Sequence, residues 1–144
     1  MTRYITRLLG PVVFTILFGV ATAQGQPTCS NAILQGSYGL HATGAGGNFA
    51  AVGRFTFDGK GNLTGTLFAR VAGNDLEVHI TGTYTVNSDC TVDDTWNFSG
   101  NSSTHKSVIV DQGKGYFILN NTSGDSTIIS GEARKQFAKS ENDD

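Results

Sequence analysis

Charge is scarce in this sequence. Of its 144 residues, 15% are Asp, Glu, Lys or Arg, and the formal net charge at pH 7 is −2. The basic residues form no cluster along the chain. Binding to nucleic acid or to an anionic lipid surface depends on clustered positive charge. We therefore expect neither nucleic acid nor a membrane surface among the partners of this protein.

The sequence also lacks the short motifs that identify common catalytic and metal sites. The run Gln-Gly-Ser-Tyr-Gly at 35–39 lacks the first glycine of a nucleophile elbow and precedes no predicted helix. The two Gly-Lys-Gly runs do not continue into the Lys-Ser/Thr that opens a helix in a phosphate-binding loop. His41, His79 and His105 fall on three different predicted strands, without the spacing of metal ligands. We expect no metal and no cofactor.

Long apolar runs are absent except at the N-terminus. Arg3 and Arg7 precede an apolar stretch from 8 to 21, which ends in a small-x-small site at 21–23. This order is typical of a secretory signal peptide. We predict a signal peptide over residues 1–23 and a secreted or periplasmic mature protein that begins near Gln24; a retained N-terminal anchor is the alternative. Cleavage leaves 8 basic against 12 acidic residues, a net charge of −4.

Cysteine is rare as well, because the chain has only Cys29 and Cys90. In the oxidising compartment that export implies, we expect these two residues to form an intramolecular disulfide. The bond would tie an irregular N-terminal lead-in, residues 24–33, to the middle of the chain. It would close a loop of roughly 60 residues, for which chain entropy gives about 4 kcal/mol at most. A reactive thiol is the alternative, but neither cysteine has activating neighbours in sequence.

What the sequence does contain is the pattern of β-strands. In the run 80–92, Tyr84 and Val86 point to one side and Thr83 and Thr85 to the other, and a turn at 87–89 follows. Similar segments, separated by glycine-rich or polar turns, recur along the chain. The predicted strands are 34–43, 49–58, 62–71, 76–87, 90–98, 104–111, 116–120 and 126–134.

Eight strands joined by short turns, with no amphipathic helix of useful length, indicate an all-β fold with antiparallel neighbours. We predict an eight-stranded antiparallel up-and-down β-barrel over residues 34–135, because closure removes exposed strand edges. A two-sheet β-sandwich is the alternative. Residues 136–144 are a polar C-terminal tail. Glycines inside the strands would let a small barrel coil tightly; they are Gly36, Gly53, Gly65, Gly82 and Gly131.

Several turn and bend motifs occur together in this chain. They are Val52-Gly53, Phe57-Asp-Gly-Lys-Gly-Asn-Leu63, Thr64-Gly65, Gly82-Thr-Tyr-Thr-Val-Asn-Ser-Asp-Cys90, Val110-Asp111 with Gly113-Lys114, and Ser130-Gly131 before Arg134. With them the sequence resembles a group of small exported bacterial proteins that have an allene oxide cyclase barrel-like domain. The resemblance covers about residues 34–134, nearly all of the mature chain.

This resemblance implies a calycin-like barrel, related in shape to plant allene oxide cyclases and dirigent proteins. Those relatives steer a reactive intermediate inside an apolar barrel and are often trimers, so a homotrimer is implied here too. The shared motifs are turn and bend residues, which specify a fold far better than a chemistry. No catalytic residue is therefore carried over to this sequence.

Asp94 is the strongest candidate for a catalytic residue. It shares one side of its predicted strand with Val92, Trp96 and Phe98. If that side faces the barrel interior, the carboxyl group can work as a general acid or base in an apolar lining. In the alternative interpretation the strand bulges, or Asp94 lies near the rim and pairs with an arginine, for which the candidates are Arg54, Arg70 and Arg134.

Aromatic side chains are numerous enough to line a ligand pocket. We expect Trp96, Tyr38, Tyr84, Phe55, Phe57 and Phe98 as ligand contacts, with the tyrosine hydroxyls as hydrogen-bond donors. The same rings could instead fill the barrel solidly, because eight strands leave either result. The sequence thus favours an exported barrel of unassigned activity that binds a small apolar molecule. The alternative is a cofactor-free cyclase or isomerase of the allene oxide cyclase or dirigent type.

Overall fold

The computed structural model describes residues 28–124 and 127–136. The predicted signal peptide, residues 24–27 of the predicted lead-in and residues 137–144 of the predicted tail lie outside the described residues. Within the described residues, no helix is long and apolar enough to span a membrane.

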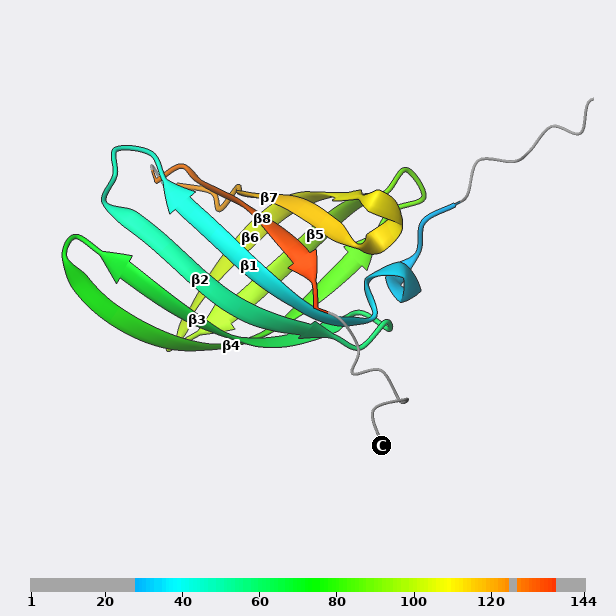
Figure 1. The fold of residues 1–144 in the computed structure, drawn as a ribbon, viewed down its shortest axis with the longest axis horizontal. Coiled ribbons are helices and arrows are strands. Elements are labelled where there is room, and N and C mark those ends of the chain that lie inside the picture. Colours follow the sequence, from blue (N-terminus) through cyan, green and yellow to red (C-terminus); the bar gives the residue numbers. More distant parts are fainter. Residues whose placement is uncertain (1–27, 125–126, 137–144) are drawn as a thin grey trace, which may run out of the picture.

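Eight antiparallel strands follow one another around a closed barrel (Figure 1). The strands are β1 (Gly36–Gly44), β2 (Phe49–Phe57), β3 (Asn62–Val71), β4 (Asn74–Val86), β5 (Thr91–Phe98), β6 (Asn101–Val110), β7 (Gly115–Asn120) and β8 (Ile129–Lys135). Two short 3-10 helices, η1 (Asn31–Leu34) and η2 (Asp111–Gly113), complete the described elements.

Pairing between β1 and β8 closes the barrel. Leu40 lies opposite Ala133, and Ala42 lies opposite Gly131, in an antiparallel register that runs from Tyr38 to the end of β1. The up-and-down barrel predicted from the sequence is therefore confirmed, and the β-sandwich alternative is wrong. A sandwich would leave the first and last strands as edges, whereas here their backbone groups satisfy one another.

The alternation of side chains decides which residues face the bore. In β5, Val92, Asp94 and Trp96 are buried, while the intervening Asp93 and Thr95 are only partly covered. Small residues allow the sheet to curve tightly. A Cβ atom at Gly82 would lie 2.2 Å from the carbonyl oxygen of Thr95, a distance that no side chain tolerates. The predicted use of glycine inside strands thus has a steric cause at this position.

Aromatic rings fill one half of the bore. Phe57 makes edge-to-face contacts with Tyr38, Tyr84 and Tyr116 at centroid distances of 5.4, 5.0 and 5.8 Å. Burial raises the pKa of Tyr38 to about 12, with a smaller contribution from Tyr84, and raises the pKa of Tyr116 well above its ordinary value. We call this region the packed half of the barrel.

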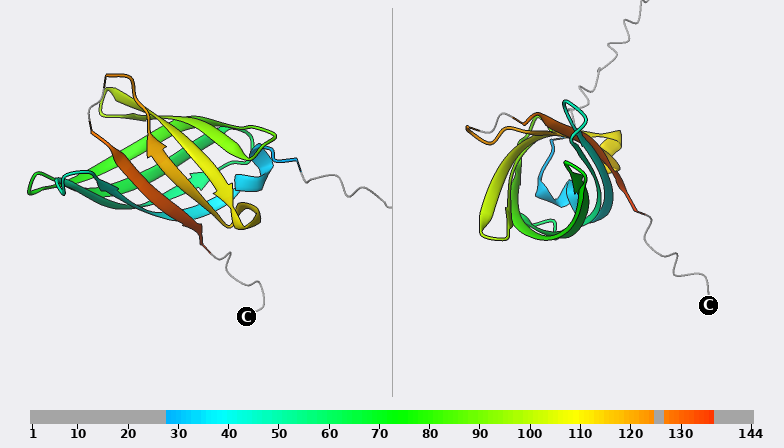
Figure 2. Two further views of the ribbon diagram at one scale, coloured as in Figure 1. Left: turned by 90° about the horizontal axis from the view of Figure 1, so that it is seen from above. Right: turned by 90° about the vertical axis from the view of Figure 1, so that its left-hand side faces the viewer.

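The N-terminal segment covers the end of the bore in the packed half. Helix η1 crosses the end of the bore (Figure 2), and its last residue, Leu34, is 1% exposed. Two hydrogen bonds hold it there: the Asn31 side-chain oxygen accepts the Val86 N–H at 2.7 Å, and the Tyr84 hydroxyl donates to the Asn31 carbonyl at 3.2 Å. The prediction that Leu34 begins the first strand is wrong. Leu34 is the last residue of η1, and its side chain packs into the hydrophobic core inside the bore.

The predicted disulfide between Cys29 and Cys90 is confirmed. It anchors η1 to the turn between β4 and β5, where Cys90 adopts a positive φ of 67°. The bond spans 61 residues of chain, so it restricts the unfolded chain strongly.

Reduction should destabilise the barrel by about 4 kcal/mol at most, the chain-entropy value for a loop of this length. Urea unfolding of the protein, followed with and without reductant, measures this difference. A double Cys29→Ser, Cys90→Ser variant should match the reduced protein and be insensitive to reductant. An unchanged unfolding midpoint on reduction would contradict a role of the bond in holding η1.

Candidate functional site: an apolar cavity beside a buried Asp–His pair

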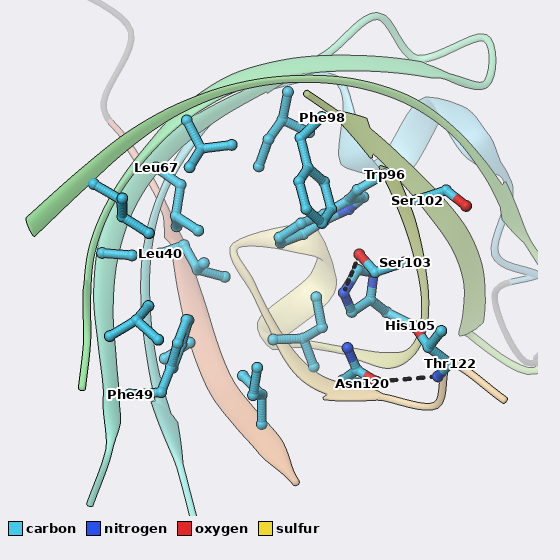
Figure 3. Close-up of a pocket in the computed structure, with 18 residues that line it drawn as sticks. Leu40, Phe49, Leu67, Trp96, Phe98, Ser102, Ser103, His105, Asn120 and Thr122 are labelled. Atoms are coloured by element: carbon cyan, nitrogen blue, oxygen red, sulfur yellow. Dashed lines mark hydrogen bonds between the residues drawn. The ribbon is translucent and has the colours of Figure 1, made fainter. Parts of the chain in front are cut away.

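A cavity of about 290 Å³ occupies the half of the bore opposite η1 (Figure 3). All eight strands contribute to its wall or rim. The residues that line it are Leu40, Ala42, Phe49, Leu67, Ala69, Val71, Leu76, Val78, Ile80, Trp96, Phe98, Ser102, Ser103, His105, Ile118, Asn120, Thr122 and Ile129.

The two sides of this cavity differ in chemistry. Strands β1 to β4 contribute only aliphatic and aromatic side chains, such as Leu40, Leu67 and Phe49. The polar groups are confined to β6, β7 and the residues just after β7, in Ser102, Ser103, His105, Asn120 and Thr122. An apolar molecule would therefore have one polar wall against which a single functional group can be oriented.

Trp96 forms the boundary between the packed half and the cavity. One contact of its indole is a stack on Phe55, with ring centroids 4.6 Å apart, and another is a tilted contact with His105 at 4.2 Å. Phe55 is fully buried, whereas Trp96 lines the cavity. The indole nitrogen Nε1 is buried and has no hydrogen-bond partner in the described part of the chain. A buried donor without a partner is costly. The same holds for Ser107 Oγ and the Tyr116 hydroxyl, which do not line the cavity.

Asp94 is buried and paired with His105. Oδ1 of Asp94 lies 2.7 Å from Nδ1 of His105, and the two side chains are 5% and 7% exposed. The two residues face each other across β5 and β6, because they are register partners. An ionised carboxylate only accepts hydrogen bonds, so Nδ1 of His105 is the donor to Asp94. In the neutral imidazole, Nε2 is then an acceptor.

The chain of hydrogen bonds continues to Ser103. Its Oγ lies 3.3 Å from Nε2 of His105 and faces the ring in the cavity (Figure 3). On the neighbouring strand, Oδ1 of Asn120 accepts the backbone N–H of Thr122 at 3.0 Å. This bond fixes the orientation of the Asn120 amide, whose nitrogen points toward the cavity (Figure 3).

The predicted alternatives for Asp94 are wrong. It lies on a regular stretch of strand, and none of the three arginines is its partner: Arg70 pairs with Asp75, Arg134 with Asp111, and Arg54 hydrogen-bonds to Ser37. Asp94 faces the interior as the first interpretation required, but His105, not Asp94, lines the cavity.

His105 is a partner of Asp94 that the strand pattern alone does not reveal. The sequence predicts that the sixth strand begins only at Thr104, but β6 begins at Asn101 after a two-residue turn. Ser99 and Gly100 at that turn both have positive φ, of 47° and 79°. A two-residue hairpin turn at this point would have placed Asp94 opposite His105 from the sequence alone.

The six predicted ligand contacts separate into two groups. Trp96 and Phe98 line the cavity, and their role as ligand contacts stays a prediction. The other four are absent from the cavity lining and contribute to the hydrophobic core; they are Tyr38, Tyr84, Phe55 and Phe57. Side chains therefore fill one half of the barrel, and the other half contains a cavity.

Metal binding has no support in the described residues, where no three His, Cys, Asp or Glu side chains cluster. Of the three histidines, His105 is buried, whereas His41 and His79 are exposed. His79 lies near Glu77, with Nε2 and Oε1 3.9 Å apart.

Comparison with known proteins finds the fold but no family. No protein-family model and no curated protein matches this chain. Among solved structures, a de novo designed fluorescence-activating β-barrel is 14% identical, with a TM-score of 0.56 over 71% of this chain and 93% of the designed chain. The structure of EF1p2_mFAP2b bound to DFHBI is 12% identical, with a TM-score of 0.54 over 72% and 94%. These similarities show a common barrel fold.

Removing either member of the buried pair should be costly, because the other is left unpaired. We expect Asp94→Ala and His105→Ala each to lower the free energy of unfolding by about 3–5 kcal/mol. The double variant should lose less than the sum of the two. Urea unfolding of the four proteins measures the coupling.

Asp93 and Lys106 provide the matched control on the outer face of the same two strands. Their side chains are 48% and 58% exposed and form an ion pair. Alanine at either position should cost less than about 1 kcal/mol. Strict additivity at Asp94 and His105 would show that the buried pair is not coupled.

Proposed function

We propose that this protein binds a small apolar molecule that carries one polar group, inside the open half of its barrel. The observation that carries this proposal is the 290 Å³ cavity, whose lining is apolar on one side and polar on the other. Pockets for small molecules are typically lined by apolar side chains and a few well-placed polar groups, with volumes of about 300–1,000 Å³. This cavity lies at the small end of that range, so it suits a compact ligand.

The fold comparison supports the same proposal. A barrel of similar fold, EF1p2_mFAP2b, holds DFHBI. The aromatic pair Trp96 and Phe98 would contact a flat ring in this cavity, while His105 and Ser103 would meet its polar group.

Export of the mature chain to a secreted or periplasmic location belongs to the proposal. It rests on the N-terminal sequence pattern together with the Cys29–Cys90 disulfide, since such bonds persist in oxidising compartments. The resemblance to exported proteins with an allene oxide cyclase barrel-like domain points the same way.

A second candidate function is a cofactor-free cyclase or isomerase. The buried Asp94–His105 pair favours it, because Asp94 fixes the imidazole so that Nε2 can take and return a proton at the cavity wall. The cavity would fold a flexible apolar substrate around this base. In this role His105 is the catalytic residue and Asp94 positions it.

Binding can be measured through the single tryptophan of the chain, which lies in the cavity wall. Phenylnaphthylamine, an apolar dye, should bind with energy transfer from Trp96. Ala69→Phe, which fills the cavity, should weaken binding at least about tenfold, the equivalent of 1.4 kcal/mol. Ala50→Phe, at an exposed position on β2, should leave binding unchanged. Equal dye affinity in both variants would contradict binding in the cavity.

Proton transfer can be measured with nitrobenzisoxazole, a small aromatic probe that opens when a base removes its ring proton. The protein should accelerate this reaction, and His105→Gln, which removes the imidazole base, should abolish the acceleration. His79→Gln, at a histidine whose side chain is 79% exposed, is the control and should have no effect. Undiminished turnover by His105→Gln would exclude His105 as the base.

A further inference from the structure

We propose that Ser103, His105 and Asp94 form a nucleophilic triad that hydrolyses small apolar esters. The proposal rests on the cavity accepting an apolar molecule, as proposed above, but it adds a covalent chemistry that binding does not require. We infer the substrate class from the two sides of the cavity. The apolar acyl group of an ester would pack against β1 to β4, and its carbonyl would lie against the polar wall.

The three side chains stand in the order that an activated serine requires. Asp94 Oδ1 lies 2.7 Å from His105 Nδ1, and Ser103 Oγ lies 3.3 Å from His105 Nε2. The carboxylate holds the imidazole in the tautomer whose Nε2 accepts the serine proton. A serine–histidine distance slightly beyond an ideal hydrogen bond is common without substrate.

The β5–β6 hairpin supplies this arrangement from paired strands. Ser103 and His105 are two residues apart on β6, so both face the bore. Asp94 is the register partner of His105, and Trp96 is the register partner of Ser103. The indole of Trp96 also packs against the imidazole and restrains the ring. Side chains held on paired strands keep their positions better than side chains on loops.

Asn120 offers the hydrogen-bond donor for a developing oxyanion. It is the register partner of His105 on β7 and lines the same cavity. Its Oδ1 is occupied by the Thr122 N–H, so its nitrogen is the group directed at the cavity (Figure 3). A fixed donor of this kind stabilises charge on a carbonyl oxygen when the tetrahedral intermediate forms.

The reaction balances with water as the only co-reactant. Ser103 Oγ bonds to the ester carbonyl carbon while its proton moves to Nε2 of His105, and Asn120 donates to the carbonyl oxygen. The bond between the carbonyl carbon and the alcohol oxygen then breaks, and the alcohol leaves with the proton from His105. Water attacks the acyl-Ser103 ester, gives its proton to His105 and releases the acid; the proton returns to Ser103 Oγ.

Hydrolysis of para-nitrophenyl acetate and butyrate by the mature protein tests the proposal. Ser103→Ala should lower kcat/KM by about 10²-fold or more, because the remaining groups cannot form an acyl-enzyme. Ser130→Ala is the matched control, because this serine is exposed on β8 and does not line the cavity, and it should retain full activity. Full activity in Ser103→Ala overturns the proposal.

Covalent labelling gives a second readout that does not depend on turnover. Phenylmethylsulfonyl fluoride should add one sulfonyl group per chain, located at Ser103 by peptide mass spectrometry, and should not label Ser103→Ala. Labelling at any other residue, or none, overturns the triad. Binding of phenylnaphthylamine by the untreated protein separates the two proposals: intact binding without hydrolysis or labelling refutes the triad alone, and absence of binding refutes the cavity as a binding site.

Discussion

Closure of the sheet is the constraint on which the rest of this structure depends. Once β8 pairs with β1, every strand has two neighbours, and every second side chain is committed to the bore. The interior residues cannot move outward without breaking two ladders of backbone hydrogen bonds. The side chains inside the bore therefore form both the hydrophobic core and the cavity wall.

The bore is divided because its large rings are unevenly distributed. Phe57, Tyr38, Tyr84 and Tyr116 pack together at one end, where Leu34 and the disulfide-anchored η1 complete the seal. Beyond Trp96, small residues such as Ala42 and Ala69 line the wall, and they leave space. The packed half thus places a close-packed core directly beside the cavity.

The buried polar side chains between the packed half and the cavity cost free energy of folding. A buried Asp–His pair is weak evidence for stability, since well-packed apolar residues of similar volume often serve a core as well or better. Its position beside the cavity, with Ser103 Oγ 3.3 Å from His105 Nε2, is the basis of the catalytic roles proposed for it. The same closure that hides Asp94 from water places the opposite edge of His105 where a ligand can reach it.

The sequence by itself determined the strands and their order, because period-2 alternation and turn glycines act over a few residues. It favoured an up-and-down barrel, and the pairing of β1 with β8 decided its closure. It also determined the Cys29–Cys90 pair, since two cysteines have one partner each. It singled out Asp94 through its apolar neighbours on one strand. Only the tertiary structure decided that His105 is its partner and that Tyr38 and Phe55 pack instead of lining the cavity. Those facts depend on register between strands and on depth along the barrel axis, and a one-residue change in a turn alters both while leaving the local pattern the same.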